Sequence, residues 1–353
     1  MALAPTPSVT FLLLCYNQER YVGDAVRAAL AQDHRPLKIL ISDDCSSDRT
    51  FSVIRNTVAD YQGPHEVRVV QTPGNLGLMA HLRKCVEAID TEWIVAAAGD
   101  DVSIPSRAST IMRAVSRRPG IDAVTSSVKT IDANGTPDRL GVGSMLEFLI
   151  PASSLPRPSQ RGRTIGYLVS HLGMIIGAAE AWKRSIWTDF PWPQSACTED
   201  VVAGFRAAMR GGTISLRQRL VQYRRHESNM WSVAGINVPR RGSELHQRRR
   251  LLLLGSIEQH EVDLRFAVSQ GTVPKELADE LETLLWVKRG VADIPETVDG
   301  GAARSVAGLL SRVASDIRGR APTDSWLPNR LSGWKSRCHR EISHWIINRH
   351  LRL

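Results

Sequence analysis

The segment SVTFLLLCYNQERYVGDAVRAALAQDHRPLKILISDD, from Ser8 to Asp44, decides the fold. Its first part, Ser8 to Leu14, is a short apolar run with β-branched residues, which is typical of a buried strand. A second apolar run, Leu37 to Ser42, follows the break at Pro36 and ends in two aspartates. Between the two runs, apolar residues recur at helical spacing: Val22, Val26, Ala29 and Leu30. The segment therefore predicts a strand, a helix and a second strand in a βαβ unit.

The alternation of helices and strands continues beyond this unit. We expect helices from about Asp48 to Tyr61 and from Leu78 to Ala88, and strands at Glu66 to Gln71 and Trp93 to Ala98. Continuous apolar strands that alternate with helices predict a mainly parallel α/β sheet with helices on both faces. Because ligands bind such sheets beyond the carboxyl ends of the strands, the site is expected at that edge.

The character of the chain changes near residue 240. Before it, residues 164–223 return to mixed α/β character, with a helix around Glu199 to Arg210 and a strand at Thr213 to Tyr223. The preceding segment, Gly141 to Arg163, is rich in Pro, Gly and Ser, which predicts a mobile loop.

Residues 241–353 form a basic and mainly helical C-terminal region. Apolar residues in Leu251 to Phe266 and in Leu277 to Val287 recur at helical spacing. We therefore expect a first domain of residues 1–240 and a helical extension after it.

The composition excludes several classes of protein. The chain has 353 residues, of which 42% are apolar and 23% charged, as in an ordinary globular protein. No apolar run reaches the roughly 18 to 20 residues of a membrane-spanning helix, and the N-terminus lacks the features of a secretory signal. The five cysteines are an odd number without a CxxC pair, which argues against a disulfide framework and a zinc cage. We expect a reduced, cytoplasmic protein.

The net charge of +9 is concentrated at the C-terminus. The last 24 residues, 330–353, contain six Lys/Arg and one acidic residue, and their apolar residues recur at helical spacing: Trp334, Cys338, Ile342, Trp345 and Ile346. Such a helix either lies on an anionic membrane surface or packs on its own domain, and the sequence leaves both open. A nucleic-acid partner is not expected, since carboxylates at three strand ends would repel phosphate.

Acidic pairs follow two of the expected strands. Asp43-Asp44 could accept hydrogen bonds from a pyrimidine imide or from ribose hydroxyls, whereas Ser47 or Asp48 could simply cap the next helix. Asp100-Asp101 could hold Mg²⁺ or Mn²⁺ together with phosphate oxygens, or could form a surface turn. Their common position beyond strand ends favours a binding site.

Two later clusters carry further candidate groups. Glu199 and Asp200 open a helix, where carboxylates also complement the positive end of the helix dipole. Arg224 and His226 follow a strand and gather cationic hydrogen-bond donors that could bind an anionic ligand, or could belong to an exposed basic turn.

These stretches, in this order and spacing, resemble the family 2 glycosyltransferases of the GT-A fold, over roughly Pro7 to Ser232. The resemblance implies an inverting enzyme that moves a sugar from a nucleotide diphosphate to an acceptor hydroxyl. The matching stretches are Cys15 to Val22, Ser42 to Thr50, Asn75-Leu76-Gly77, Gly99-Asp100-Asp101, Thr198-Glu199-Asp200 and Arg224-Arg225-His226.

The resemblance also implies roles for individual residues. It divides the first domain into a nucleotide-binding part at about 7–135 and an acceptor and catalytic part at about 164–235. Asp200 matches the general base, and Asp101 the ligand of a divalent metal, Mg²⁺ or Mn²⁺. Glu199, Arg224 and His226 would contact the diphosphate or the acceptor. The nucleotide-sugar would contact Tyr16, Asn17, Glu19, Asp43, Asp44, Asn75 and Asp100.

The chain departs from the family pattern at two places. Leu14-Cys15 stands where the family often has Pro or Thr before Tyr-Asn, and Ala98-Gly99 shortens the acidic motif. The shortened motif leaves open which of Asp100 and Asp101 is the main metal ligand.

The family's Gln-x-x-Arg-Trp motif of processive synthases is not found, which predicts transfer of a single sugar. We expect a UDP- or dTDP-sugar donor and a glycan or lipid-linked glycan acceptor in cell-surface polysaccharide biosynthesis. The basic tail would keep the enzyme at the inner face of the cytoplasmic membrane, and the 141–163 loop would close over the donor. The alternative is a catalytically inactive nucleotide-sugar-binding or scaffolding module of a glycan assembly complex.

Overall fold

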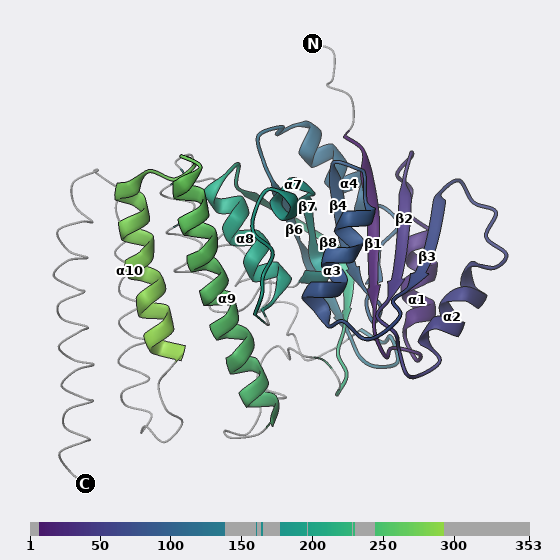
Figure 1. Cartoon of the computed structure of the whole chain (residues 1–353). Helices are drawn as coiled ribbons and strands as arrows, with labels where there is room; N and C mark the ends of the chain where they lie inside the picture. Colours follow the sequence, from purple (N-terminus) through teal and green to yellow (C-terminus); the bar gives the residue numbers. More distant parts are fainter. Residues whose placement is uncertain are drawn as a thin grey trace, which may run out of the picture.

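An eight-stranded mixed sheet is the framework of the computed structural model, which describes residues 7–137, 160, 164, 177–195, 197–227, 229 and 244–292. The strands lie in the order β3-β2-β1-β4-β7-β6-β8-β5 (Figure 1). Their bounds are β1 Val9–Cys15, β2 Lys38–Asp43, β3 Glu66–Gln71, β4 Trp93–Ala98, β5 Val102–Ser103, β6 Ala123–Ile131, β7 Glu180–Lys183 and β8 Thr213–Arg224. The helices are α1 Val22–Leu30, α2 Thr50–Val58, α3 Leu78–Ala88, α4 Arg107–Ser116, α7 Ser185–Thr188, α8 Glu199–Met209, α9 Glu244–Ser269 and α10 Lys275–Ala292, and the 3-10 turn η1 Gly177–Ala179 precedes β7.

The first half of the sheet is parallel, as the sequence predicted. Strand β1 pairs with β2 and with β4 in parallel, and the register places Cys15 opposite Asp43 and Leu14 opposite Ala98. The carboxyl ends of these three strands therefore meet at one edge. The predicted elements from β1 to β4 and the helix and strand at α8 and β8 are confirmed, with ends shifted by a few residues at most.

The second half of the sheet is mixed. Strand β7 is antiparallel to both β4 and β6, β6 is parallel to β8, and β5 is antiparallel to β8. The sequence did not reveal β5, β6, β7 or α4. Strands of two and four residues are too short to show a hydrophobic period, and serines interrupt the apolar pattern of β6.

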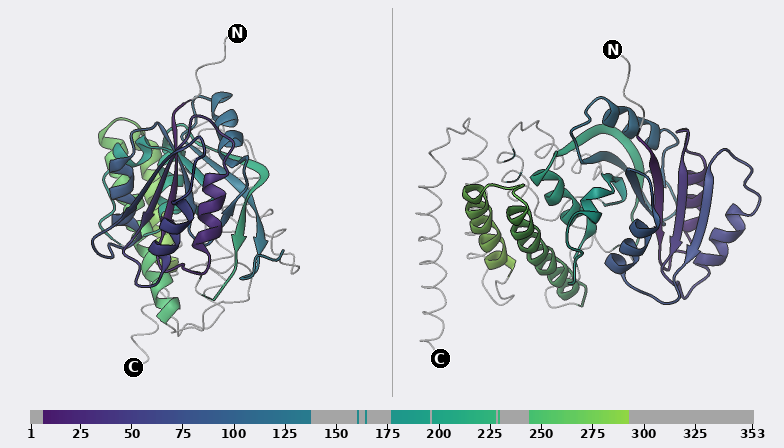
Figure 2. Two further views of the ribbon diagram at one scale, coloured as in Figure 1. Left: turned by 90° about the vertical axis from the view of Figure 1, so that its right-hand side faces the viewer. Right: turned by 45° about the horizontal axis from the view of Figure 1, so that its top comes forward.

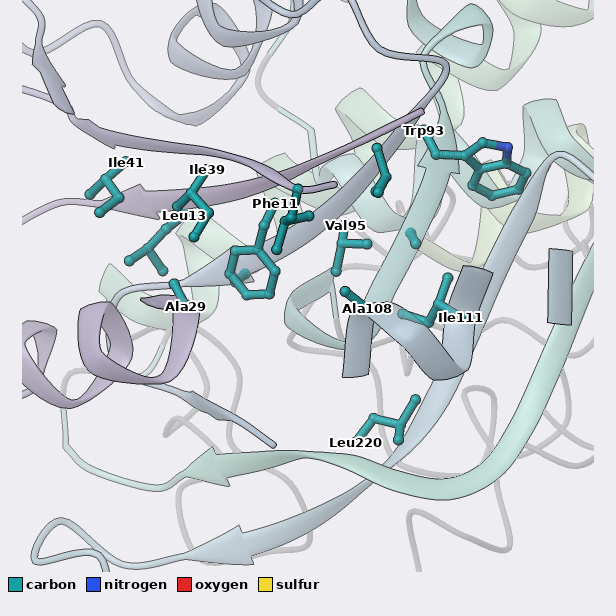
Figure 3. Packing of buried hydrophobic residues seen from close by; sticks show 14 of the residues in the cluster. Phe11, Leu13, Ala29, Ile39, Ile41, Trp93, Val95, Ala108, Ile111 and Leu220 are labelled. Atoms are coloured by element: carbon teal, nitrogen blue, oxygen red, sulfur yellow. The ribbon is translucent and has the colours of Figure 1, made fainter. Parts of the chain in front are cut away.

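Two hydrophobic cores cover the two faces of the sheet. On one face, alternate residues of β1, such as Phe11 and Leu13, pack with β2 and β4 against α1 and α4 (Figure 3). On the other face, Leu12 lies in a second cluster that includes Leu82 of α3 and Val202 of α8. Because side chains alternate across a strand, one apolar run supplies both cores. The two cores hold α1 on one face of the sheet and α3 on the other.

The helices α9 and α10 lie at the opposite end of the molecule from β3 and α2 (Figures 1 and 2). They confirm the helices predicted from the periodicity after residue 240. A third core joins them to α8, because Phe205 and Met209 pack with Ile257, Leu264 and Leu281. The domain boundary near residue 240 stays a prediction.

Several predictions fall outside the described residues. These are the basic C-terminal helix of residues 330–353 and almost all of the loop from 141 to 163. In the part of the chain that the structure describes, no helix combines the length and the apolar character needed to cross a bilayer.

Candidate functional site

The loops that follow β1 and β2 are joined by hydrogen bonds. The N–H of Asn17 donates to Oγ of Ser46 (2.8 Å), and Oδ1 of Asn17 accepts from the N–H of Ser47 (2.8 Å). The carboxylate of Glu19 accepts from the N–H of Arg49 (2.9 Å). The side chains of Asn17 and Glu19, both predicted to bind the nucleotide, therefore hold these two loops together.

Asp43 and Asp44 are buried at the end of β2, and donors of the same chain surround both. Asp43 accepts from the backbone and side chain of Ser46 and from Nε2 of Gln71 (2.9 Å). Asp44 accepts from Oγ1 of Thr72 (3.0 Å) and from the N–H groups of residues 76 and 77 (3.0 and 2.9 Å). Asp44 thus shapes the loop that carries Asn75.

Two of the predicted nucleotide-binding side chains are exposed beside these loops. The Tyr16 side chain is 44% exposed, which is unusual for a large aromatic residue. Asn75 is also exposed, and its Oδ1 accepts from the N–H of Gly77 (2.9 Å). An exposed aromatic ring with polar neighbours offers a stacking surface for a planar ligand.

The pairing of β5 with β8 brings the end of β4 to the end of β8. Nε2 of His226 donates to Oδ2 of Asp100 (3.0 Å), and the imidazole stacks on Tyr21 of the β1–α1 loop, with ring centroids 4.7 Å apart. Nδ1 of His226 is buried and has no hydrogen-bond partner among the described residues. The structure thus brings together two of the predicted site residues.

Arg224 is buried, and its guanidinium binds protein groups. It donates to the backbone oxygen of Asp100 (2.9 Å), to Oδ2 of Asp24 in α1 (2.9 Å) and to the backbone oxygen of Ala133 (3.4 Å). The Arg224 N–H also donates to Oδ1 of Asp101 (2.7 Å). Arg224 therefore fixes the turn that carries Asp100 and Asp101, a role that the sequence did not predict.

Asp101 and Glu180 are buried carboxyl groups with one buried cation between them. Burial and the charge of Asp100 raise the pKa of Asp101, and burial and the charge of Asp200 raise the pKa of Glu180. Arg107, the first residue of α4, interacts with both carboxyl groups and donates to the backbone oxygens of Ala96 and Glu180 (2.6 and 3.1 Å). Sequence reasoning missed Arg107 and Glu180, although Glu180 is an isolated charge within an apolar stretch; Arg107 lies among serines and has no such signal.

Glu199 and Asp200 lie in the first turn of α8, where the pKa of each carboxyl group is raised. Burial raises the pKa of Asp200 to about 6, although hydrogen bonds from Val201, Thr198 and Gly177 act in the opposite direction and lower it. Burial and then the charge of Asp200 raise the pKa of Glu199 to about 8. Both carboxyl groups therefore hold a proton more readily than an exposed carboxyl does, because burial disfavours the charged form and the two charges repel each other.

The buried side chain of Tyr223, near the end of β8, interacts electrostatically with the strand-end carboxylates and with Asp200. Burial, followed by the charges of Asp101, Asp100 and Asp200, raises the pKa of Tyr223. The predicted metal ligand and the predicted base therefore both act on one side chain, although about 100 residues separate them in the sequence.

The residues around Asp101 fit a divalent cation. Asp101 is a buried carboxyl group beside a second carboxylate, Asp100. No three His, Cys, Asp or Glu side chains of the described ranges are grouped to hold a metal ion. Mg²⁺ is commonly bound by one or two protein carboxylates together with substrate phosphates and water.

Comparison with known families identifies the chain. The model of the family described as Glycosyltransferase like family 2 matches residues 5–235, which is more than half of the 353 residues. The chain belongs to this family. With the mixed sheet and its helices, family 2 membership confirms the predicted GT-A type α/β fold.

The curated relatives and solved structures that match the chain are distant in sequence. EpsE of Bacillus subtilis (strain 168) is 28% identical over 101 residues, which cover 29% of this chain and 36% of EpsE. The poly-beta-1,6-N-acetyl-D-glucosamine synthase of Staphylococcus epidermidis is 22% identical over 199 residues, 56% of this chain and 45% of the synthase. The crystal structure of S. aureus TarS with UDP-GlcNAc aligns with a TM-score of 0.49 and 14% identity, covering 88% of this chain and 90% of the other. The chain thus matches less than half the length of these two curated relatives.

Proposed function

We propose that the protein is an inverting glycosyltransferase that moves one sugar from a UDP- or dTDP-sugar to a hydroxyl of a glycan or lipid-linked glycan. The observation that carries the proposal is that Asp200, at the start of α8, acts electrostatically on the same buried side chain, Tyr223, as Asp100 and Asp101 at the end of β4. Membership of family 2 supports the reaction class. The name of the staphylococcal relative, a polysaccharide synthase, supports a role in cell-surface polysaccharide biosynthesis.

In the proposed reaction Asp200 is the general base. Its carboxylate accepts the proton of the acceptor hydroxyl as that oxygen attacks the anomeric carbon of the donor. The bond from this carbon to the phosphate oxygen breaks on the opposite face, and the nucleoside diphosphate leaves with the electron pair. Burial and the charge of Asp200 raise the pKa of Glu199, and in its protonated form Glu199 can donate a hydrogen bond to the acceptor without competing for the proton.

On the donor side, Tyr16, Asn17, Glu19 and Asn75 are exposed and available to the nucleotide. The buried Asp43 and Asp44 hold the loops that carry these side chains through their hydrogen bonds. A divalent metal would be held by Asp101, beside Asp100, together with phosphate oxygens of the donor, and when bound it would neutralise charge on the diphosphate. Arg224 acts by fixing the turn of Asp100 and Asp101.

The donor class is tested by calorimetric titration of UDP, dTDP and GDP, each with and without Mn²⁺. We expect metal-dependent binding of UDP or dTDP to the wild type and its loss in Asp101→Ala. Failure of all three nucleotides to bind in the presence of Mn²⁺ would contradict the proposed donor site.

The catalytic role is tested with Asp200→Asn. We expect transfer to fall by about 10²- to 10⁴-fold, the usual contribution of a general base, while nucleotide binding is kept. The matched control is Asp90→Asn, since Asp90 is exposed and pairs only with Lys38 among the contacts of the structure. Nucleotide binding without turnover in the wild type would support the inactive scaffolding module instead.

A further inference from the structure

One face of α9 carries polar side chains where the helix contacts α8. Ser256, Gln259, His260 and Asp263 follow the i, i+3, i+4, i+7 spacing that places residues on one face of a helix. All four are buried, beside the third hydrophobic core. We call this set the α9 polar stripe. Buried polar groups are costly unless they are hydrogen bonded, so their partners define what the stripe does.

Two members of the α9 polar stripe bind the start of α8. Oγ of Ser256 accepts from the N–H of Thr198 (3.3 Å), the residue that precedes α8. Nε2 of His260 donates to the backbone oxygen of Val201 (3.0 Å), and its ring packs against Phe205 with centroids 4.5 Å apart. Thr198 and Val201 directly flank Glu199 and Asp200. The stripe therefore holds the backbone on both sides of the proposed base.

A third member anchors the middle of α8. Asp263 binds Arg206 through two hydrogen bonds of 2.7 and 2.9 Å, and both side chains are 0% exposed. Gln259 donates to the same carboxylate (2.8 Å), and Arg206 also donates to the backbone oxygens of Ile186 and Pro191 (3.1 and 2.6 Å). A bidentate pair of guanidinium and carboxylate has a fixed planar geometry.

Stability alone does not account for the α9 polar stripe. Replacing a buried ion pair by apolar residues of similar volume is often neutral or stabilising, because the desolvation cost disappears. Hydrogen bonds are directional, so they fix both the rotation of α8 about its axis and its position along that axis. The apolar contacts of Phe205 and Met209 are not directional and do not fix either. A catalytic group needs this accuracy, since a displacement of about 1 Å can cost about 100-fold in rate.

We propose that the α9 polar stripe is a positioning element of the active site, in which His260, Ser256 and Asp263 orient the first turn of α8 and thereby Asp200. The inference rests on the proposed function of Asp200 as the base. It gives this one face of α9 a positioning role in the active site, although none of the four side chains makes a hydrogen bond to Asp200 in the described structure.

The test compares two substitutions of His260. His260→Leu keeps an apolar side chain against Phe205 and removes the donor to Val201, whereas His260→Gln keeps an N–H donor at a similar reach. We expect kcat of His260→Leu to fall by about 10- to 100-fold with an unchanged Kd for UDP in the presence of Mn²⁺, and His260→Gln to recover most of the loss. Rates are expressed per molecule that binds UDP.

The control is Glu261→Gln. Glu261 is the next residue of α9, but it pairs with Arg289 of α10 (2.9 Å), away from α8. We expect its kcat to match the wild type. The inference would be overturned if kcat per UDP-binding molecule were the same in His260→Leu and in the wild type. In that case the substitution would only reduce the number of folded molecules, as expected for a residue with a purely structural role.

A second readout does not depend on turnover. In His260→Leu we expect the amides of the first two turns of α8 to exchange hydrogen at least about tenfold faster, with β1 and β2 unchanged. His260→Gln should exchange as the wild type does. If wild-type protein transfers no sugar, the proposed function fails while this exchange still tests the inference; unchanged exchange in His260→Leu would refute the inference alone.

Discussion

Nε2 of His226 lies 3.0 Å from Oδ2 of Asp100, a residue 126 positions earlier in the chain. The antiparallel pairing of Val102 with Gln222 and of Ser103 with Val221 produces this contact, because it joins the turn after β4 to the end of β8. The imidazole is held from its other side by stacking on Tyr21. A histidine placed in this way orients Asp100.

This contact predicts the effect of His226→Phe. The phenyl ring can still stack on Tyr21, but both nitrogens are lost. We expect the affinity for UDP in the presence of Mn²⁺ to fall by about 10- to 100-fold, the usual effect of removing a group that orients a metal ligand. Calorimetry with and without Mn²⁺ checks the prediction. Tyr21→Phe is the matched control and should bind normally, and an equal loss with and without Mn²⁺ would contradict a role at the metal.

The pKa of Asp200 predicts the pH dependence of transfer. Burial raises this pKa to about 6, and only the ionised carboxylate can accept the acceptor proton. We therefore expect kcat/KM to increase roughly tenfold per pH unit below about 6 and to level off above it. Initial rates between pH 5 and 8 test this expectation. A flat profile over that range, with chemistry rate-limiting, would argue against Asp200 as the base.

The raised pKa of Glu199 predicts how the stability depends on pH. The folded pKa of about 8 lies above the unfolded value of 4.5, so Glu199 stabilises the fold when protonated. This stabilisation is fully present at pH values below the unfolded pKa and is lost as the pH rises through the folded pKa. The Tm of Glu199→Gln minus that of the wild type should therefore grow between pH 5 and 8 and then level off.

Differential scanning fluorimetry at several pH values measures this difference. Glu87→Gln is the matched control, because Glu87 is exposed and pairs with Arg83 on the surface of α3. Its Tm difference should stay nearly constant over the same range. A constant difference for Glu199→Gln would mean that the group titrates as an exposed carboxyl does.

Arg224 and Arg27 share one partner, Asp24, and differ in burial. The Arg224 side chain is 3% exposed and makes two further hydrogen bonds, to the backbone oxygens of Asp100 and Ala133, whereas the Arg27 side chain is 64% exposed. We expect Arg224→Met to lower the free energy of unfolding by on the order of 2–3 kcal/mol, since hydrogen bonds to charged groups are lost. Arg27→Met should cost less than about 1 kcal/mol. Urea denaturation measures both, and similar values would show that Arg224 is not a structural anchor.

Much of the fold could be predicted from the sequence, because the parallel half is encoded locally. The apolar strands β1 to β4 and the helices between them show their periods within a few residues, and each strand ends in the polar cluster that marks the site edge. The second half could not be predicted in this way. Strands β5 and β7 are too short to have a period, and their partners lie far away in the sequence.

The sequence by itself determined the strand and helix pattern of the first 100 residues, the acidic and basic motifs, and the resemblance to family 2. Only the tertiary structure decided which polar side chains bind each other. It joins His226 to Asp100, Arg224 to Asp24 and Arg206 to Asp263. The tertiary structure also buries Asp200 and Glu199, which raises the pKa of both carboxyl groups. The physical reason is that desolvation, charge pairing and hydrogen-bond geometry depend on neighbours brought together by the sheet and by α9, and residue spacing along the chain does not record them.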